Sequence, residues 1–458
     1  WVKFNNQPAP PKVGITLKES STYTDFANIN TGGITEDGKD GVNEVSYIIL
    51  DCMDEMKLLQ PSSNVQISRK TPRKFLKRAC EISRKGWGQP AFYNTEAIVS
   101  ELMNAGKSLD DARMGGTSGC VETGAFGNEA YILQGYFNLP KILELTLYDG
   151  YDHVGGHQLG LHTGFAKDFN SYEEFFEAYK KQIKYFVDIK VAGSNVIEQI
   201  FAQYMPAPFL SILTNDCIKK GKDYNAGGAR YNTNYIQGVG IGTITDSLAA
   251  IKYNCFDHHN FTMEELVEAM DHNFEGYDRI YHLVTHKTPK YGNDDDYADD
   301  IMKDIFTYYR DCVTGRPNTK GGFYRINMLP TTCHVYFGEV MNASPTAALH
   351  TSLYPREYPP KRAQTSTVPP ALSTPAPRWI SFPQAVRCSI RSSHPQSLRA
   401  TPDSTSLPTL SAPTSTWTAT ISSSTSSTAR RCWLPRPILR STKTSSSALQ
   451  VTAIISAT

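Results

Sequence analysis

The chain of 458 residues lacks paired cysteines, because its nine cysteines stand singly with no Cys-x-x-Cys spacing. This pattern argues against a disulfide framework and a structural zinc site, and it predicts reduced thiols and a cytoplasmic location. A run of about 18 apolar residues is also lacking, so we expect no membrane span and no membrane partner. Trp1 opens the sequence with neither an initiator methionine nor a signal-peptide profile, and we expect a fragment without its upstream part.

Acidic residues and glycine are scarce in the last quarter of the chain. From Thr346 onward there are 12 Lys and Arg against two acids, and no Gly, Asn or Met, although 32 Gly precede this point. A basic tail is typical of nucleic-acid binding, whereas the Ser, Thr and Pro content is typical of a disordered linker. Residues 346–458 are therefore a low-complexity segment that differs in kind from residues 1–345.

Apolar periodicity before this segment predicts helices and strands in alternation. Helices are predicted at 45–56, 96–103, 139–147, 172–204, 262–283 and 296–312, and strands at 64–68 and 90–93. The alternation indicates an α/β architecture with a largely parallel sheet.

Three details of these elements can be checked in a structure. Val45 and Ile48 belong to the apolar pattern of the first helix, and Ile189 belongs to the core face of the helix at 172–204. Thr71 followed by Pro72 is the expected cap and first residue of a further helix. The acidic run around Asp294 to Asp300 is expected to be a solvated helix start and not a cation site.

The most informative stretch is Gly-Gly-Thr-Ser-Gly-Cys-Val-Glu at residues 115–122. Its small residues permit a tight loop, and alternate residues of an extended segment can reach the same cavity. Cys120 and Glu122 could therefore place a thiol and an acid/base group on either side of one small substrate. A lone cysteine is more often a small buried hydrophobic residue, so this spacing alone does not establish a site.

Together with the residues that follow it, through Leu-Gln-Gly-Tyr136, this stretch resembles the glycyl radical enzymes, and the resemblance extends over residues 1–345. It implies a partial glycyl-radical-enzyme β/α barrel, ten-stranded in that family, in which Cys120 becomes the thiyl radical and Glu122 transfers a proton. In the dehydratase branch the implied reaction converts trans-4-hydroxy-L-proline to 1-pyrroline-5-carboxylate and water.

The same resemblance assigns four further positions to the substrate pocket. These are Ser20 in Lys-Glu-Ser-Ser, Phe26 in Asp-Phe-Ala-Asn, Tyr136, and Thr331 in Leu-Pro-Thr-Thr. Hydroxyl groups and aromatic walls suit a small zwitterionic amino acid. The implied partners are a radical S-adenosylmethionine activating enzyme and, in the intact family, a second copy in a homodimer. No bound cofactor is implied, since the family uses a post-translational glycyl radical.

The segment after Pro345 does not continue the resemblance in the reading frame of the chain. Codons for Ser441 to Thr458, read from each third base, can encode Arg-Val-Ala-Gly-Tyr, the pattern of the family's glycyl radical loop. The same operation on Leu353 to Thr365 also gives a family-like sequence. We hypothesise that a net loss of one nucleotide after Pro345 put the radical domain out of frame. The radical glycine is then not encoded, and we expect no turnover by the chain as translated.

Other functions remain open from the sequence. Glycerol or propanediol dehydratase and choline lyase are alternatives within the family, whereas a formate acetyltransferase would use two adjacent cysteines, and Gly119 precedes Cys120 here. A cysteine hydrolase would need a base such as His334, and a basic nucleic-acid binder would depend on the tail alone, so no nucleic-acid partner is expected. His153, His157 and His162 lack metal-ligand spacing.

The glycines at 238–242 also fail as a dinucleotide fingerprint. The third glycine follows too soon, and the sequence shows no evident strand before them.

Overall fold

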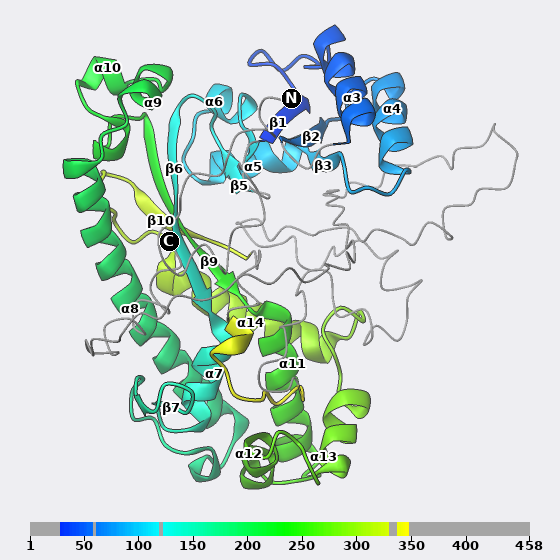
Figure 1. Cartoon of the computed structure of the whole chain (residues 1–458), viewed down its shortest axis with the longest axis vertical. Helices are drawn as coiled ribbons and strands as arrows, with labels where there is room; N and C mark the ends of the chain where they lie inside the picture. The colour runs from blue at the N-terminus through cyan, green and yellow to red at the C-terminus, as the bar shows by residue number, and fades with distance from the viewer. Residues whose placement is uncertain (1–27, 58–60, 119–121, 329–336, 348–458) are drawn as a thin grey trace, which may run out of the picture.

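The computed structural model describes residues 28–57, 61–118, 122–328 and 337–347 (Figure 1). The longer strands are β1 (Asn28–Gly32), β2 (Ser62–Ile67), β3 (Ala91–Asn94), β6 (Glu129–Asn138), β9 (Tyr231–Val239) and β10 (Phe323–Asn327). The short strands are β4 (Gly116–Ser118), β5 (Glu122–Gly124), β7 (Tyr151–Asp152) and β8 (His157–Gln158). Two parallel sheets result, ordered β1-β2-β3 and β10-β9-β6, beside the antiparallel hairpins β4-β5 and β7-β8.

Helices connect and cover these strands. The α-helices are α3 (Glu44–Met56), α4 (Arg73–Ser83), α5 (Thr95–Asn104), α6 (Leu109–Arg113), α7 (Leu139–Leu147), α8 (Tyr172–Tyr204), α9 (Pro208–Leu213), α10 (Cys217–Lys220), α11 (Ile241–Ile251), α12 (Met263–Asp271), α13 (Asp278–His282) and α14 (Asp296–Val313). Short 3-10 and π segments are η1 (Ala166–Asp168), η2 (Tyr224–Ala226), η3 (Lys252–Asp257) and η4 (Leu283–Lys287). No helix within these described ranges has the length and apolar character needed to cross a bilayer.

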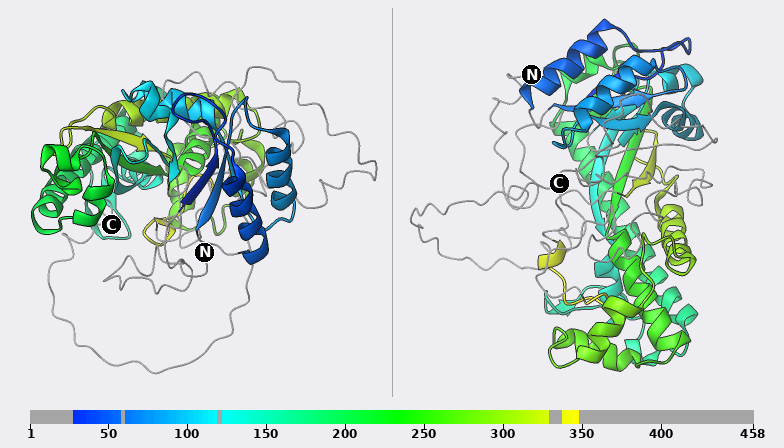
Figure 2. Two further views of the ribbon diagram at one scale, coloured as in Figure 1. Left: turned by 90° about the horizontal axis from the view of Figure 1, so that it is seen from above. Right: turned by 90° about the vertical axis from the view of Figure 1, so that its right-hand side faces the viewer.

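The first sheet and its helices form one end of the molecule. Figures 1 and 2 show β1–β3 with α3 and α4 in blue at this end, α12 and α13 in green at the other, and the long strands β6 and β9 running between. Leu50, Met53 and Phe75 join Val65 of β2 in a small core. The predicted apolar face of α3 is wrong in part, because Val45 and Ile48 are exposed and the buried face is rotated towards Leu50 and Met53.

The start of α4 also differs by one residue from the expectation. The capping position is Pro72, which has extended backbone, and Arg73 is the first helical residue. Thr71 does not cap the helix, because its hydroxyl accepts a hydrogen bond from the backbone N–H of Ser68 at 2.9 Å. The Thr71 side chain thus pairs with a backbone N–H of the loop before the helix and not with an N–H of the helix itself.

The second sheet separates an apolar layer from a polar one. Ile236 of β9 and Tyr324 of β10 pack into a large core with residues of α7, α8, α11 and α14. On the other face of β9, the alternate residues Tyr235 and Gln237 bond with β5, and Thr233 bonds with Glu129 of β6. One face of this sheet therefore supports the fold, and the opposite face supports the candidate site.

An irregularity in β6 brings Tyr136 into this arrangement. The register against β9 shifts between Leu133 and Tyr136, and Gly135 at this shift has a φ of +94°. Such a bulge changes which side chains face each way. Tyr136 then packs with Val239, Phe337 and Met341, while Phe137 enters the large core.

Two of the helices that cover the second sheet, α7 and α8, have the predicted bounds. α7 begins after Asn138 and α8 after Ser171, and each of these side chains accepts a hydrogen bond from the helix's first turn. Along α8, Phe175, Tyr179 and Ile183 are buried as expected. Ile189 is only half-buried, and Lys190 next to it is the buried residue, at 1% exposure.

The single helix predicted at 262–283 is wrong. Thr262 caps α12, but this helix ends at Asp271, where Asn273 and Phe274 adopt left-handed backbone conformations. The next helix, α13, starts only at Asp278 and passes into the π segment η4. Left-handed residues cannot continue an α-helix, so the periodic pattern is divided between two shorter elements.

The glycines at 238–242 do follow a strand, contrary to the sequence-based expectation. β9 leads into α11 through Gly240, which has a φ of +102°. A Cβ on Gly238 would lie 2.7 Å from the sulfur of Met328 and 2.9 Å from the ring of Tyr309. Close packing therefore requires a glycine at this position.

Candidate active site

The candidate site is built around the β4-β5 hairpin. β4 ends at Ser118, β5 begins at Glu122, and these two residues are paired in the antiparallel register. Cys120 belongs to residues 119–121, which lie outside the described residues. The strands on either side of it are described, and they fix where this segment enters and leaves.

Amide side chains of the first sheet hold β4. Asn30 donates to the carbonyl of Thr117 at 2.8 Å and accepts from the Thr117 N–H at 3.1 Å, which pairs both backbone groups of that residue. Asn64 donates to the Thr117 hydroxyl at 2.8 Å. Gln66 donates to the carbonyl of Gly115 at 3.3 Å. Because Thr117 is fully buried, these bonds replace those that water would make with the strand.

Glycine is required where this hairpin meets the sheet. A Cβ on Gly116 would lie 2.5 Å from the ring of Phe126 and 2.6 Å from Nε2 of Gln66. A Cβ on Gly115 would lie 2.3 Å from Leu102. The small residues that drew attention in the sequence therefore let β4 approach its neighbours closely.

The second sheet holds β5 from the other side. The Gln237 amide donates to Oε1 of Glu122 at 2.6 Å, and the Tyr235 hydroxyl donates to the carbonyl of Thr123 at 3.1 Å. Glu122 is 8% exposed. A short bond from an amide to a carboxylate fixes the carboxylate's orientation, so Glu122 is presented in one defined position.

Buried ion pairs support the same face of the second sheet. Lys107 and Glu129 are 2.9 Å apart, and Glu129 also accepts a hydrogen bond from the Thr233 hydroxyl. Burial lowers the pKa of Lys107, while the nearby Glu129 opposes this shift. Arg325 lies 3.6 Å from Glu101. This network fixes the polar side of the sheet next to the hairpin.

The structure describes two of the six predicted site residues. Glu122 and Tyr136 are connected through the centre of the sheet, because Gln237 bonds to Glu122 and is the register partner of Tyr136. The predicted positions outside the described residues are Ser20, Phe26, Cys120 and Thr331, together with the alternative base His334. Their roles stay predictions.

Sequence reasoning missed Gln237 and the amide clamp on β4. The available signal was the unusual polarity of a buried strand, since Tyr231–Val239 reads Tyr-Asn-Thr-Asn-Tyr-Ile-Gln-Gly-Val. Polar side chains in a buried strand need partners, and this indicates a polar neighbour.

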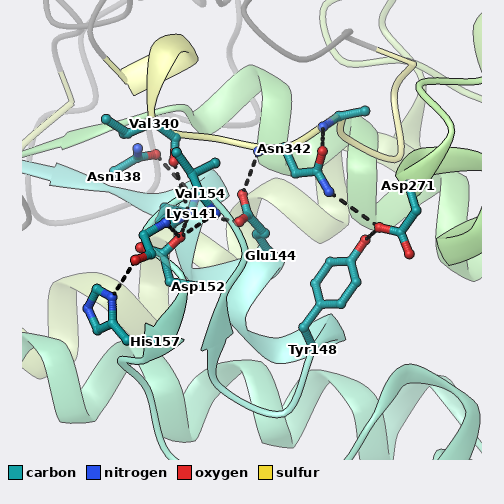
Figure 3. Close-up of polar contacts among 12 residues, drawn as sticks. Asn138, Lys141, Glu144, Tyr148, Asp152, Val154, His157, Asp271, Val340 and Asn342 are labelled. Atoms are coloured by element: carbon teal, nitrogen blue, oxygen red, sulfur yellow. Dashed lines mark hydrogen bonds and ion pairs between the residues drawn. The ribbon is translucent and has the colours of Figure 1, made fainter.

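A separate polar cluster anchors the last described segment. Figure 3 shows Nζ of Lys141 bonded to Glu144 at 2.7 Å, to Asp152 at 2.7 Å and to the carbonyl of Val340 at 2.9 Å. The N–H of Asn342 donates to the other oxygen of Glu144 at 3.0 Å. Burial raises the pKa of Glu144, and Lys141 opposes that rise. The cluster ties residues 337–347 to α7, the helix that follows Tyr136.

In the described part of the chain, no three or more His, Cys, Asp or Glu residues are arranged to hold a metal ion. His157, one of the three histidines considered from the sequence, makes a 3.0 Å contact from Nδ1 to the carbonyl of Gly155.

Sequence comparison identifies similar proteins. A family model described as pyruvate formate lyase-like matches residues 1–338. Trans-4-hydroxy-L-proline dehydratase of Clostridioides difficile is 72% identical over 349 residues, covering 76% of this chain and 44% of that protein. The (2S)-3-sulfopropanediol dehydratase of Klebsiella oxytoca is 30% identical over 346 residues, covering 75% of this chain and 42% of that protein. The chain thus spans less than half the length of these relatives.

Solved structures of related enzymes are also similar to this chain. The C. difficile hydroxyproline dehydratase with trans-4-hydroxy-L-proline bound has a TM-score of 0.78 at 69% identity, covering 80% of this chain and 46% of that one. The glycerol-bound B12-independent glycerol dehydratase from Clostridium butyricum has a TM-score of 0.73 at 36% identity, covering 77% of this chain and 44% of that one. The expected α/β fold is confirmed, and the chain belongs to the pyruvate formate lyase-like family of glycyl radical enzymes.

Proposed function

We propose that this chain is the catalytic part of a glycyl radical dehydratase that converts trans-4-hydroxy-L-proline to 1-pyrroline-5-carboxylate and water. The observation that carries the proposal is the 72% identity over 349 residues to a dehydratase of that substrate. The substrate-bound relative, at 69% identity, supports the same choice.

In this reaction Cys120 and Glu122 have separate roles. The Cys120 thiyl takes a hydrogen atom from the ring carbon next to nitrogen, forming S–H and leaving a carbon radical. The neighbouring hydroxyl then leaves as water with a proton supplied by Glu122, and the ring nitrogen of the substrate gives up a proton that restores the glutamic acid. The S–H returns its hydrogen atom to the product radical, so the substrate loses only water.

The contacts of Glu122 suit this proton transfer. Its carboxyl group is nearly buried and oriented by Gln237. An acid held at a fixed position typically contributes about 10²–10⁴ in rate. Tyr136, Ser20, Phe26 and Thr331 are the proposed walls and polar contacts of the pocket.

The glycyl radical supplies the hydrogen-atom acceptor that first generates the thiyl. No cofactor is bound, the partner is a radical S-adenosylmethionine activating enzyme, and the complete enzyme is a cytoplasmic homodimer that acts on a small amino acid. Residues 346–458 are the radical domain read out of frame. Sequencing the source DNA around the Pro345 codon tests this, because an intact frame would make the tail a genuine part of the protein.

Function is tested with a full-length, in-frame version activated anaerobically. Product should form from trans-4-hydroxy-L-proline and not from glycerol, 1,2-propanediol, choline, or pyruvate with coenzyme A. Glu122→Gln should lower kcat by at least 100-fold while the glycyl radical signal remains. Turnover of glycerol in place of hydroxyproline would select the second candidate, a polyol dehydratase, which the likeness to glycerol dehydratase supports.

A further inference from the structure

Gln237 occupies a central place beside the candidate site. It is the residue of β9 paired with Tyr136 of β6 on one side and Asn327 of β10 on the other, and its side chain is fully buried. Its amide nitrogen donates the 2.6 Å bond to Glu122. The orientation of the amide is set by this contact, because a carboxylate can accept only from the NH₂ side.

The other end of the same amide has no hydrogen-bond partner in the described part of the chain. Oε1 of Gln237 is a buried acceptor without a hydrogen bond among the described residues. A buried acceptor left unpaired costs free energy comparable to a lost hydrogen bond, so a partner is expected when the site is occupied. Both amide atoms belong to one rigid group, so the bond to Glu122 also fixes the direction of Oε1.

A second fully buried glutamine shows what a purely structural role looks like. Gln182 of α8 accepts from the Leu161 N–H at 2.9 Å and donates to the Leu161 carbonyl at 2.7 Å and to the Thr163 hydroxyl at 3.1 Å. Each end of its amide is paired within the fold. Gln237 is paired at the end that meets Glu122 and open at the other.

We propose that Gln237 is a positioning residue for Glu122 and that its Oε1 accepts a hydrogen bond from the hydroxyl group that leaves the substrate. This deepens the proposed function and rests on it. When the hydroxyl gains a proton from Glu122, the departing water has two O–H groups, and the carboxylate and Oε1 together provide two acceptors. The contact strengthens as water forms, so it favours the transition state over the bound substrate.

Charge at this position also restricts how the ligand is oriented. The carbonyl oxygen of Gln237 is an acceptor with a partial negative charge, so it repels the carboxylate of an amino-acid substrate and attracts its hydroxyl. The substrate class is therefore a small molecule that presents a hydroxyl to Glu122 and keeps its acidic group away from it.

The test uses the full-length radical-loaded enzyme with Gln237→Met, which keeps the side-chain size and removes both polar atoms. The expected result is a fall in kcat of about tenfold or more with KM changed less than threefold. Hydrogen abstraction should continue, so in D₂O the recovered substrate should still gain deuterium at the ring carbon next to nitrogen. Gln182→Met is the matched control, and it should lower thermal stability while leaving the ratio of exchange to dehydration unchanged.

Equal loss of exchange and dehydration in Gln237→Met, or loss of neither, would overturn the inference. If the proposed function itself is wrong, the result is different, because the unsubstituted enzyme will then form no pyrroline product at all. A crystal structure of this chain soaked with trans-4-hydroxy-L-proline gives a test without radical chemistry. The hydroxyl oxygen should lie about 2.7–3.2 Å from Oε1; a protein donor, a lone water or the substrate carboxylate in that place contradicts the proposal.

Discussion

Replacing Lys141 by methionine should destabilise the protein strongly. Nζ of Lys141 lies 2.7 Å from both Glu144 and Asp152, and all three side chains are at least nine-tenths buried (Figure 3). Methionine keeps most of the side-chain volume but removes the cation that pairs with both carboxylates among the described residues, which leaves Glu144 and Asp152 facing each other. Breaking a buried ion pair in this way costs about 3–5 kcal/mol.

The acid dependence of the variant follows from Glu144. Burial already raises the pKa of this carboxyl group, and removing Lys141 removes the charge that opposes the rise. A carboxyl with a raised folded pKa binds protons more tightly in the folded state, so stability falls as pH rises. The loss caused by Lys141→Met should therefore be larger at pH 8 than at pH 5.

Urea-induced unfolding at both pH values measures these effects, and hydrogen exchange of residues 340–342 reports the local consequence. Lys184→Met is the control. Lys184 pairs with Asp188, one turn further along the same helix, and both side chains are exposed, so this ion pair should contribute under about 1 kcal/mol. A Lys141→Met variant within about 1 kcal/mol of the original protein would refute the energetic reasoning.

Three further substitutions should each change the stability of the fold in a defined direction. Burial raises the pKa of Asp299 to about 6, so the folded state loses stability as pH rises from about 4 to 6. The Asp299→Asn variant should be about 1–3 kcal/mol more stable than the original protein at pH 8 and equally stable below pH 4. Denaturant titrations at the two pH values measure this difference. Burial lowers the pKa of Lys190 from 10.5 to about 7, so Lys190→Met should raise the free energy of unfolding by about 2–4 kcal/mol at pH 6. This stabilisation should shrink as pH rises from 7 towards 10.5. A difference that does not depend on pH would contradict the prediction. Gly116→Ala places a methyl group 2.5 Å from the ring of Phe126 and should lower stability by about 1–3 kcal/mol; an unchanged thermal unfolding midpoint would contradict this.

Elements with local signals could be predicted from the sequence. α7 and α8 have the expected bounds because a capping side chain precedes each one and an apolar period of three and four residues continues through it. The parallel α/β arrangement followed from alternation of elements. Glu122 and the small residues of the Cys loop were likewise visible as a local motif.

Features that depend on tertiary contacts could not be predicted in this way. The clamp between Asn30 and Thr117 joins residues 87 positions apart, and the bond between Glu122 and Gln237 joins residues 115 apart. Periodicity also could not tell that Lys190 is buried. Its burial depends on how α8 lies against α7 and α14, which a single helix pattern does not specify.

The central claim is that Cys120 carries out the chemistry, and one measurement tests it most directly. In a full-length, in-frame and radical-loaded enzyme, Cys120→Ser should retain the glycyl radical signal and form no detectable 1-pyrroline-5-carboxylate from trans-4-hydroxy-L-proline, while the unsubstituted enzyme forms it. Continued dehydration by the serine variant would contradict the account.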